Sequence, residues 1–135
     1  MTRYLLDTNH LSHAIGKISP LRDRIRQSRR QGNKFITTWL NLYELEVGIV
    51  QTKNPVSCHR NLKTLLKEVQ LRPLDWDLMS TFGQMHLLAK NRGCALSFVD
   101  KLVAALAMHE NAIILTADTD FQGLKEIQTE NWLTP

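Results

Sequence analysis

Short apolar runs that end in polar residues alternate with helical patterns along this chain, and this alternation constrains its fold more than any other feature. The first run, Arg3 to Leu6, stops at Asp7, and a helical pattern that ends near Gly16 follows at once. Further runs at 34–38 and 112–116 also stand beside helical segments. Apolar strands without polar alternation are typical of parallel sheets, and helices supply the crossovers between such strands. We therefore predict an α/β fold with a parallel sheet and helices on both faces.

Capping residues and apolar periodicity locate the helices. Thr8 or Asn9 is expected to cap the first helix. The later helices are expected at these positions: from Ser19-Pro20, over 39–51, from Asn54-Pro55, over 75–92, and from Ser97 to Asn111. Gly48 lies inside the second of these, where glycine costs roughly 1 kcal/mol relative to alanine. We therefore expect another element to pack closely against Gly48.

The end of the chain and one short piece before it complete the expected sheet. Residues 71–74 are expected to be extended, and Pro73 places them at a sheet edge because proline cannot donate to a strand ladder. The tail through Ile127 and Trp132 is expected to form a last short strand and a packing cap.

Length and composition fit one domain, so we predict a single domain over residues 1–135. The sequence contains no apolar run of the ~18 residues that a membrane span needs. The N-terminus does not have the layout of a signal peptide. Cys58 and Cys94 fit neither a metal-binding spacing nor a disulfide framework. We expect a cytoplasmic protein with no membrane partner.

The chain carries a formal net charge of +4, which weakly favours a polyanionic partner. Five arginines crowd the expected helix after Pro20: Arg22, Arg24, Arg26, Arg29 and Arg30. This face of the helix is either an ordinary solvated face or a surface that attracts phosphate or a protein partner.

Four acidic residues stand at comparable junctions between elements: Asp7, Glu44, Asp100 and Asp118. Asp7 and Asp118 follow expected strands, and Glu44 and Asp100 lie near the starts of expected helices. In parallel sheets, sites form beyond the carboxyl ends of the strands, so the spacing is compatible with one cluster.

Each acid also has a structural explanation when taken singly. Asp7 fits an Asx turn at a strand end, and Asp118 and Asp120 fit a turn. Asp100 stands three residues after Ser97, as in a capping box. Glu44 fits an exposed helix position.

Gathering four carboxylates requires protons or a cation. Two unit charges about 4 Å apart repel by about 4 kcal/mol at an effective dielectric of 20. Ligands that are all oxygen suit Mg²⁺ or Mn²⁺ rather than zinc. The five histidines are scattered, and we interpret them as surface or packing residues: His10, His13, His59, His86 and His109. A carboxylate-held metal beside a basic exterior favours phosphodiester hydrolysis.

The blocks that carry these acids resemble a known family. They are the Leu6-Asp7-Thr8-Asn9 run, the stretch from Glu44 to Gly48, Asp100 before an alanine-rich helix, and the Leu115-to-Asp118 stretch followed by Phe121. Their order and spacing are similar to those of the PIN-domain ribonucleases, and most closely to the VapC-type toxins of bacterial toxin–antitoxin pairs. The resemblance covers nearly the whole chain.

This resemblance implies a three-layer α/β/α fold with a parallel sheet of about five strands. It implies an endoribonuclease that depends on Mg²⁺ or Mn²⁺, uses an activated water, and cleaves tRNA, rRNA or mRNA to leave 5′-phosphate and 3′-hydroxyl ends. It further implies a cognate antitoxin that blocks the site, and a toxin homodimer.

The resemblance also assigns roles to individual residues. Asp7 and Asp100 correspond to the principal metal ligands, Glu44 to the helix glutamate, and Asp118 to the fourth acid; all four are expected to act in catalysis. Three other residues are expected to support them: Thr116 and, more weakly, Thr8 as hydroxyl groups, and Asp120 as an extra acid.

Two other classes of function remain open. One is a catalytically silent PIN scaffold that binds RNA or a protein, although the complete set of acids argues against it. The other is an aspartyl-phosphate phosphatase or a receiver-like domain. Such phosphatases need a second aspartate where Asn9 stands, and receivers need an acidic pair that the first strand lacks.

Overall fold

The computed structural model describes residues 1–134, which form a five-stranded parallel sheet flanked by six α-helices. The strand order is β3-β2-β1-β4-β5. The elements along the chain are β1 (Arg3–Leu6), α1 (Thr8–Ala14), α2 (Pro20–Arg30), β2 (Lys34–Thr37), α3 (Trp39–Ile49), α4 (Pro55–Leu65), β3 (Gln70–Leu71), α5 (Trp76–Asn91), α6 (Phe98–Glu110), β4 (Ile113–Leu115), the 3₁₀ helix η1 (Asp120–Gly123) and β5 (Thr129–Glu130). The α/β class and the parallel sheet predicted from the sequence are confirmed.

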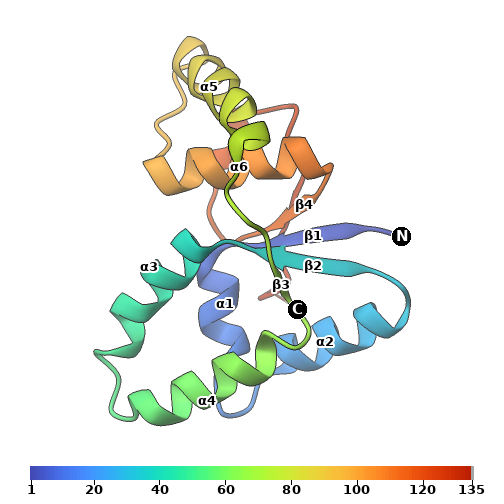
Figure 1. Cartoon of the computed structure of the whole chain (residues 1–135), viewed down its shortest axis with the longest axis vertical. Coiled ribbons are helices and arrows are strands. Elements are labelled where there is room, and N and C mark those ends of the chain that lie inside the picture. The colour runs from blue at the N-terminus through green and yellow to red at the C-terminus, as the bar shows by residue number, and fades with distance from the viewer. Residues whose placement is uncertain (135) are drawn as a thin grey trace.

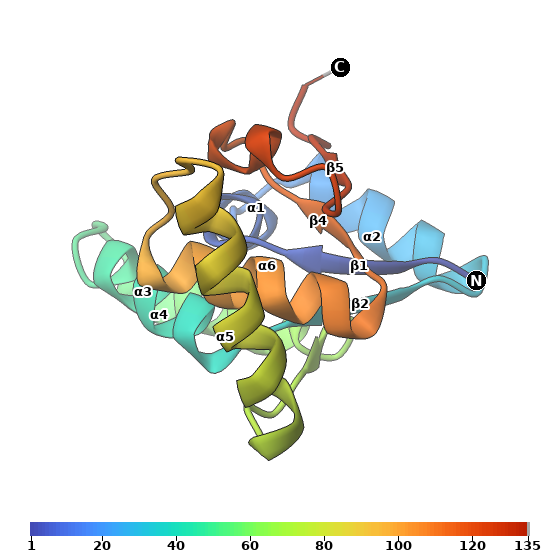
Figure 2. The same cartoon turned by 90° about the horizontal axis from the view of Figure 1, so that it is seen from above.

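The sheet separates two layers of helices, as Figures 1 and 2 show. Helices α5 and α6 pack together on one side, while α1, α2 and α4 lie on the other. Each side has its own apolar core: α5, α6 and η1 supply one, and α1 to α4 supply most of the other. The described part of the chain contains no helix long and apolar enough to cross a membrane.

Alternating residues of the central strands feed the two cores. Leu5 packs into the core beneath α6, and its neighbour Leu6 packs into the opposite core. Ile114 and Leu115 divide in the same way. Successive side chains of a strand point to opposite faces, so a strand buried on both faces must be apolar throughout. The register pairs Leu6 with Leu115, which brings the ends of β1 and β4 level.

Three helices begin where their caps predict. The side chains of Ser19, Asn54 and Ser97 accept hydrogen bonds from backbone N–H groups in the first turns of α2, α4 and α6. The first helix differs, because its N-cap is Asp7 rather than Thr8 or Asn9. Asp7 has extended backbone angles and its carboxylate accepts from the Thr8 N–H, so the helix starts one residue earlier than expected.

The expectation for Gly48 is wrong. A Cβ atom placed at Gly48 would meet nothing within 4 Å, so no neighbour requires glycine there. The edge assignment is confirmed, because β3 pairs only with β2 at the end of the sheet, although it spans Gln70–Leu71 rather than 71–74.

The tail behaves as expected. After β5, the Trp132 indole packs at 4.9 Å from Tyr4 and 5.8 Å from Phe35, measured between ring centroids. The Arg24 guanidinium covers the same indole at 3.8 Å. Trp132 therefore closes the core on the α2 side of the sheet. Cys58 and Cys94 are both free thiols.

Candidate metal centre

The candidate site lies where the strand order reverses direction. The chain runs from β1 outward to β2 and β3, and then returns to the other side of β1 with β4 and β5. Loops leave the carboxyl ends of β1 and β4 in opposite directions there, and the space between them is the usual ligand site of an open α/β sheet. Asp7 directly follows β1, and Thr116 directly follows β4. This topology brings residues more than a hundred positions apart into contact.

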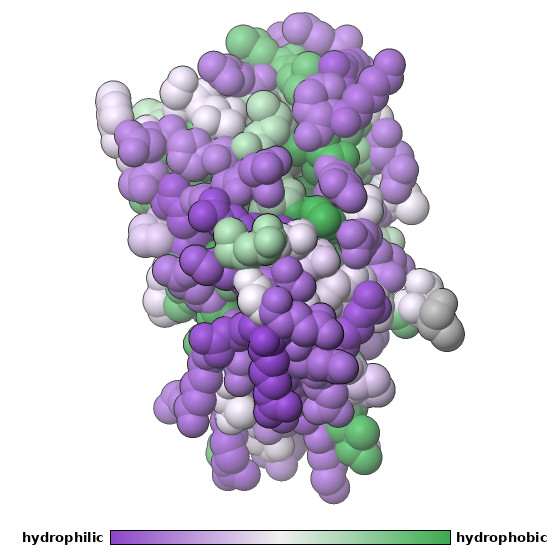
Figure 3. Space-filling view, turned by 90° about the vertical axis from the view of Figure 1, so that its right-hand side faces the viewer, coloured by the Kyte–Doolittle hydropathy of each residue, from purple (hydrophilic) through white to green (hydrophobic). Residues whose placement is uncertain are grey.

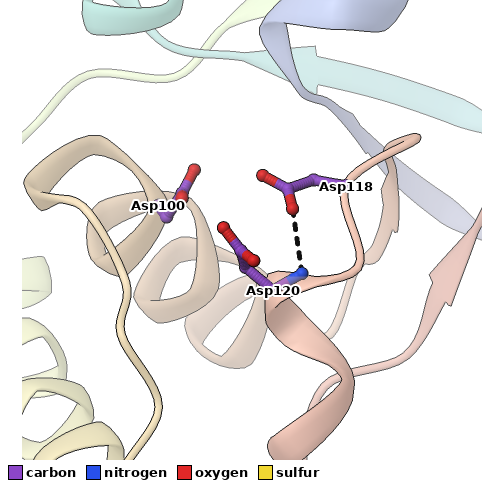
Figure 4. A group of neighbouring side chains, drawn as sticks. All are labelled: Asp100, Asp118 and Asp120. Carbon is purple, nitrogen blue, oxygen red and sulfur yellow. Dashed lines mark hydrogen bonds between the residues drawn. The ribbon is translucent and has the colours of Figure 1, made fainter.

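Three acids form a compact group at this point. One carboxylate oxygen from each of Asp100, Asp118 and Asp120 lies within 4.8 Å of the others. Figure 4 shows Asp100 reaching from α6 toward the two aspartates of the loop after β4. The loop is held by the Asp120 N–H, which donates to Asp118 Oδ1 at 2.9 Å. The group offers only oxygen ligands, which suit Mg²⁺ or Mn²⁺.

Asp7 lies buried behind this group, with 5% of its surface exposed. Its Oδ2 accepts a hydrogen bond from the Thr116 hydroxyl at 2.8 Å. Its Oδ1 accepts from the Thr8 N–H at 2.9 Å and from the Asn41 side-chain amide at 3.3 Å. These donors hold the carboxylate in one orientation, which a preorganised metal ligand requires.

Glu44 reaches the same place from α3 through a hydroxyl group. The Thr8 hydroxyl donates to Glu44 Oε1 at 2.6 Å, and it accepts from the Asn41 amide at 3.1 Å. The Thr38 hydroxyl donates to Asn41 Oδ1 at 2.6 Å, which turns the amide N–H₂ of Asn41 toward Asp7 and Thr8. Thr8 therefore acts as a bridge between the first strand end and α3.

Asn41 is the residue of this network that sequence reasoning missed. It is fully buried, although asparagine is usually exposed. The available signal was its place on the same helix face as Glu44, one turn earlier. A polar residue in that position, with an apolar neighbour on each side, indicates a buried hydrogen-bond partner of the acids.

The charges of the site are not balanced by basic side chains. Among residues 1–134, no ion pair involves any of the five acids Asp7, Glu44, Asp100, Asp118 and Asp120. Burial raises the pKa of Asp7, hydrogen bonds from Thr116 and Thr8 oppose that rise, and the charges of Glu44 and Asp118 add to it. Burial, and then the charge of Asp7, raises the pKa of Asp100 to about 6. Acids that repel one another without a basic partner fit a divalent cation.

The structure brings the predicted acids together in a slightly different grouping. Asp100 and Asp118 share the compact group with Asp120, which was expected only as a supporting acid. Asp7 adjoins the group, because its charge raises the pKa of Asp100, and Glu44 is connected to Asp7 through hydrogen bonds of Thr8. Two structural explanations also hold: the Asp120 N–H donates to Asp118 Oδ1 in a turn, and the Asp100 N–H donates to Ser97 Oγ at 3.1 Å. Asp7, for which an Asx turn was expected, is instead the N-cap of α1. An acid can cap a helix and also face a site, so these roles do not exclude each other.

Arginines of α2 make hydrogen bonds or ion pairs within the protein. Arg22 donates to the carbonyls of Ala14 and Gly16 at 3.0 and 2.7 Å, and Arg29 pairs with Glu68 at 2.8 Å. Figure 3 shows strongly hydrophilic residues over the lower part of one face, at the height of α2 in Figure 1. Arg22 and Arg29 are therefore held by groups of the protein itself, and both interpretations of the remaining face stay predictions.

The order of strands and the acidic group at their carboxyl ends define a class of protein. The family model described as the PIN domain matches residues 4–127, so the chain belongs to the PIN-domain family.

Within that family the chain is a distant, full-length homologue of the VapC-type toxin ribonucleases of VapBC toxin–antitoxin systems. It is 25% identical to Ribonuclease VapC2 of Rickettsia felis over 132 residues, which are 96% of this chain and 97% of that protein. The solved structure of VapBC2 from Rickettsia felis, bound to a promoter DNA fragment, has a TM-score of 0.83 at 22% identity and covers 97% of this chain and 99% of that one. DNA-bound VapBC from Salmonella typhimurium has a TM-score of 0.81 at 19% identity, covering 98% and 99%.

The raised pKa of Asp100 predicts a pH dependence of stability. An unfolded aspartate releases its proton near its ordinary value of 3.8, whereas folded Asp100 keeps it up to about pH 6. The folded state binds more protons within this window, so the contribution of Asp100 to the unfolding free energy falls as pH rises through it. Denaturant unfolding without metal should show wild type losing stability relative to Asp100→Asn between pH 4 and pH 7. A wild-type gain relative to the variant over that range would contradict the shift.

Proposed function

We propose that this protein is a metal-dependent endoribonuclease that acts as the toxin of a toxin–antitoxin pair. The observation that carries the proposal is the group of Asp100, Asp118 and Asp120, which lies at the strand ends with Asp7 behind it and without a basic partner. Membership of the PIN-domain family and full-length similarity to a VapC-type ribonuclease support the same activity.

The acids would hold Mg²⁺, or Mn²⁺ in its place. Asp7, Glu44, Asp100 and Asp118 are the ligands we propose, and the position of Asp120 adds it to the candidates. When bound, the ion supplies Lewis-acid chemistry: it polarises a phosphoryl oxygen and lowers the pKa of water.

The chain's own residues would orient the reactants. Thr116 and Asn41 hold the Asp7 carboxylate, and Thr8 holds Glu44, so neither acid needs to reorganise during the reaction. Asp118 or Glu44 would accept a proton from the attacking water and align it with the phosphorus. The bond between phosphorus and the 3′ oxygen would break and the 3′ oxygen would take up a proton from water, which gives 5′-phosphate and 3′-hydroxyl ends.

Cleavage of total cellular RNA by purified protein tests this proposal. Discrete fragments are expected with Mg²⁺ or Mn²⁺ and none with EDTA, and the fragment ends would identify the tRNA, rRNA or mRNA target. Intact RNA in every lane, from folded protein that binds Mn²⁺, would favour the silent PIN scaffold instead. Cleavage that survives EDTA would show a different nuclease in the preparation.

Two protein partners belong to the proposal. Several of the similar solved structures are named as VapBC or FitAcB complexes, and we propose by analogy that a cognate antitoxin blocks this acidic site.

We also propose a homodimer that uses α3. Four large apolar side chains are exposed on one face of that helix and at its C-cap, at spacings of three and four residues: Trp39, Tyr43, Val47 and Val50.

The homodimer has a direct test. Light scattering on the purified chain should give about 31 kDa, twice the 15.5 kDa of one chain. Val47→Lys should reduce the mass to that of a monomer, because a buried unpaired charge opposes association. The matched control is Ile18→Lys, since Ile18 is exposed in the loop between α1 and α2. Dimers of both variants would exclude α3 as the interface.

A further inference from the structure

His10 is a fully buried titratable residue for which the proposed reaction has no use. It lies in the first turn of α1, three residues after Asp7, and none of its surface is exposed. The Trp132 N–H donates to its Nε2 at 3.1 Å. Its Nδ1 lies 2.7 Å from Asn9 Oδ1. The ring therefore lies between Trp132 and Asn9, at the junction of β1 and α1.

The neighbouring donors determine the form of this ring. The backbone N–H of Trp132 can only donate, so Nε2 is the acceptor. The Ala117 N–H also donates to Asn9 Oδ1, at 3.2 Å, which identifies that atom as the amide oxygen. Nδ1 therefore carries the proton and donates it to Asn9. Burial lowers the pKa of His10 to about 4, which agrees with a neutral ring.

The hydrogen bonds continue from Asn9 to the acids. The Asn9 amide N–H₂ donates to Thr116 Oγ1 at 3.3 Å, and the Asp118 N–H donates to the same oxygen at 3.0 Å. Both lone pairs of the hydroxyl are then occupied. Its proton is left for Asp7 Oδ2 at 2.8 Å. The orientation of Asn9 thus sets the direction of the Thr116 hydroxyl, which donates to the Asp7 carboxylate and accepts from the Asp118 backbone N–H.

Trp132, at the other end of this series of hydrogen bonds, is fixed by packing. Trp132 packs against Tyr4 and Phe35, and the Arg24 guanidinium covers it. The Thr116 N–H also donates to the Glu130 carbonyl at 3.0 Å, so β5 is fastened beside the site. His10 is the point where this C-terminal segment, residues 129–132, joins the hydrogen bonds of α1.

We propose that His10 is a positioning residue of the metal centre. It fixes Asn9 relative to the C-terminal segment. Through Asn9 and Thr116 it also positions Asp7 and Asp118. This inference rests on the proposed function, because it assumes that these acids bind a metal. Outer partners of metal ligands typically change metal affinity 10- to 100-fold when they are removed.

Two substitutions separate the two hydrogen bonds of the ring. Asparagine places an N–H donor near the position of Nδ1, so His10→Asn keeps the bond to Asn9 and loses the one from Trp132. Glutamine places an oxygen near the position of Nε2, so His10→Gln keeps the acceptor for Trp132 and loses the donor to Asn9. His10→Leu fills the space and makes neither bond.

The measurement is Mn²⁺ affinity by titration calorimetry, with thermal melting of each metal-free variant as the measure of folding. We expect His10→Gln and His10→Leu to bind Mn²⁺ about tenfold more weakly than wild type, and His10→Asn to remain within about threefold. All three should melt below wild type. If His10→Gln does not fold, the Mn²⁺ affinity of His10→Leu is compared with that of His10→Asn instead.

Each outcome has one meaning. Equal Mn²⁺ affinity in wild type and all variants, with lower melting temperatures alone, would show that His10 only packs and would overturn the inference. Equal weakening in His10→Asn and His10→Gln would overturn it too, because the link through Asn9 would then not matter. Wild-type protein that binds no Mn²⁺ would overturn the proposed function itself, and the inference with it.

Discussion

Replacement of Asp100 by asparagine should abolish RNA cleavage and at the same time make the metal-free protein more stable at pH 7. Asp100 is one of the three acids of the compact group, and burial and the charge of Asp7 already raise its pKa to about 6. A neutral amide removes that repulsion and also removes a metal ligand. Loss of one member of a catalytic group that acts as a unit costs about a thousandfold or more in rate. Fragment yield from RNA with Mn²⁺ and denaturant unfolding without metal measure the two effects.

Asp7→Asn should lose cleavage to the same degree but should not gain stability. Its carboxylate accepts hydrogen bonds from Thr116, Thr8 and Asn41, and an amide group would place its own donor against one of them. The matched control is Asp77→Asn, an exposed aspartate in the first turn of α5, which should cleave RNA at the wild-type rate. Wild-type cleavage by Asp7→Asn or Asp100→Asn would overturn the site assignment.

Replacement of Phe121 by alanine should produce the largest loss of stability among the residues near the site. Phe121 is 1% exposed and packs from η1 into the core beneath α6. Truncation of a buried phenylalanine costs about 3–5 kcal/mol through lost burial and the cavity left behind. A domain of this kind has roughly 5–15 kcal/mol in total, so this loss is a large fraction of it. Denaturant unfolding of the metal-free protein measures the change.

The same substitution should weaken metal binding. Asp118 lies on the loop that runs into η1, Asp120 is the first residue of η1, and Phe121 anchors this segment to the core. Phe121→Leu retains most of the volume and should lose less than half as much stability. Trp76→Ala is the control, because that side chain is 79% exposed and its removal should be nearly neutral. A loss below about 1 kcal/mol in Phe121→Ala would show that the loop holds itself without this anchor.

Much of the architecture could be predicted from the sequence because each strand and each helix start depends on nearby residues. The apolar strands, the capping residues Ser19, Asn54 and Ser97, and the short edge strand each depend on a few neighbouring residues. The position of the acids at strand ends could be predicted for a related reason. The carboxyl ends of neighbouring parallel strands meet at one edge of the sheet, however long the chain segment that connects them. The sequence therefore predicted that Asp7 and Asp118 are compatible with one cluster, and the pairing of β1 with β4 in the folded chain makes them neighbours.

Side-chain geometry was decided only by the tertiary structure. Asp120 enters the compact group because the turn after β4 folds back on Asp118, and Asp7 caps α1 because its backbone is already extended there. The open space around Gly48 depends on how far its neighbours lie, which no local pattern records. Asn41 and His10 acquire their roles from partners 33 and 122 residues away along the chain, Thr8 and Trp132. A hydrogen bond forms only when two groups meet at the right distance and direction, and only the folded chain sets both.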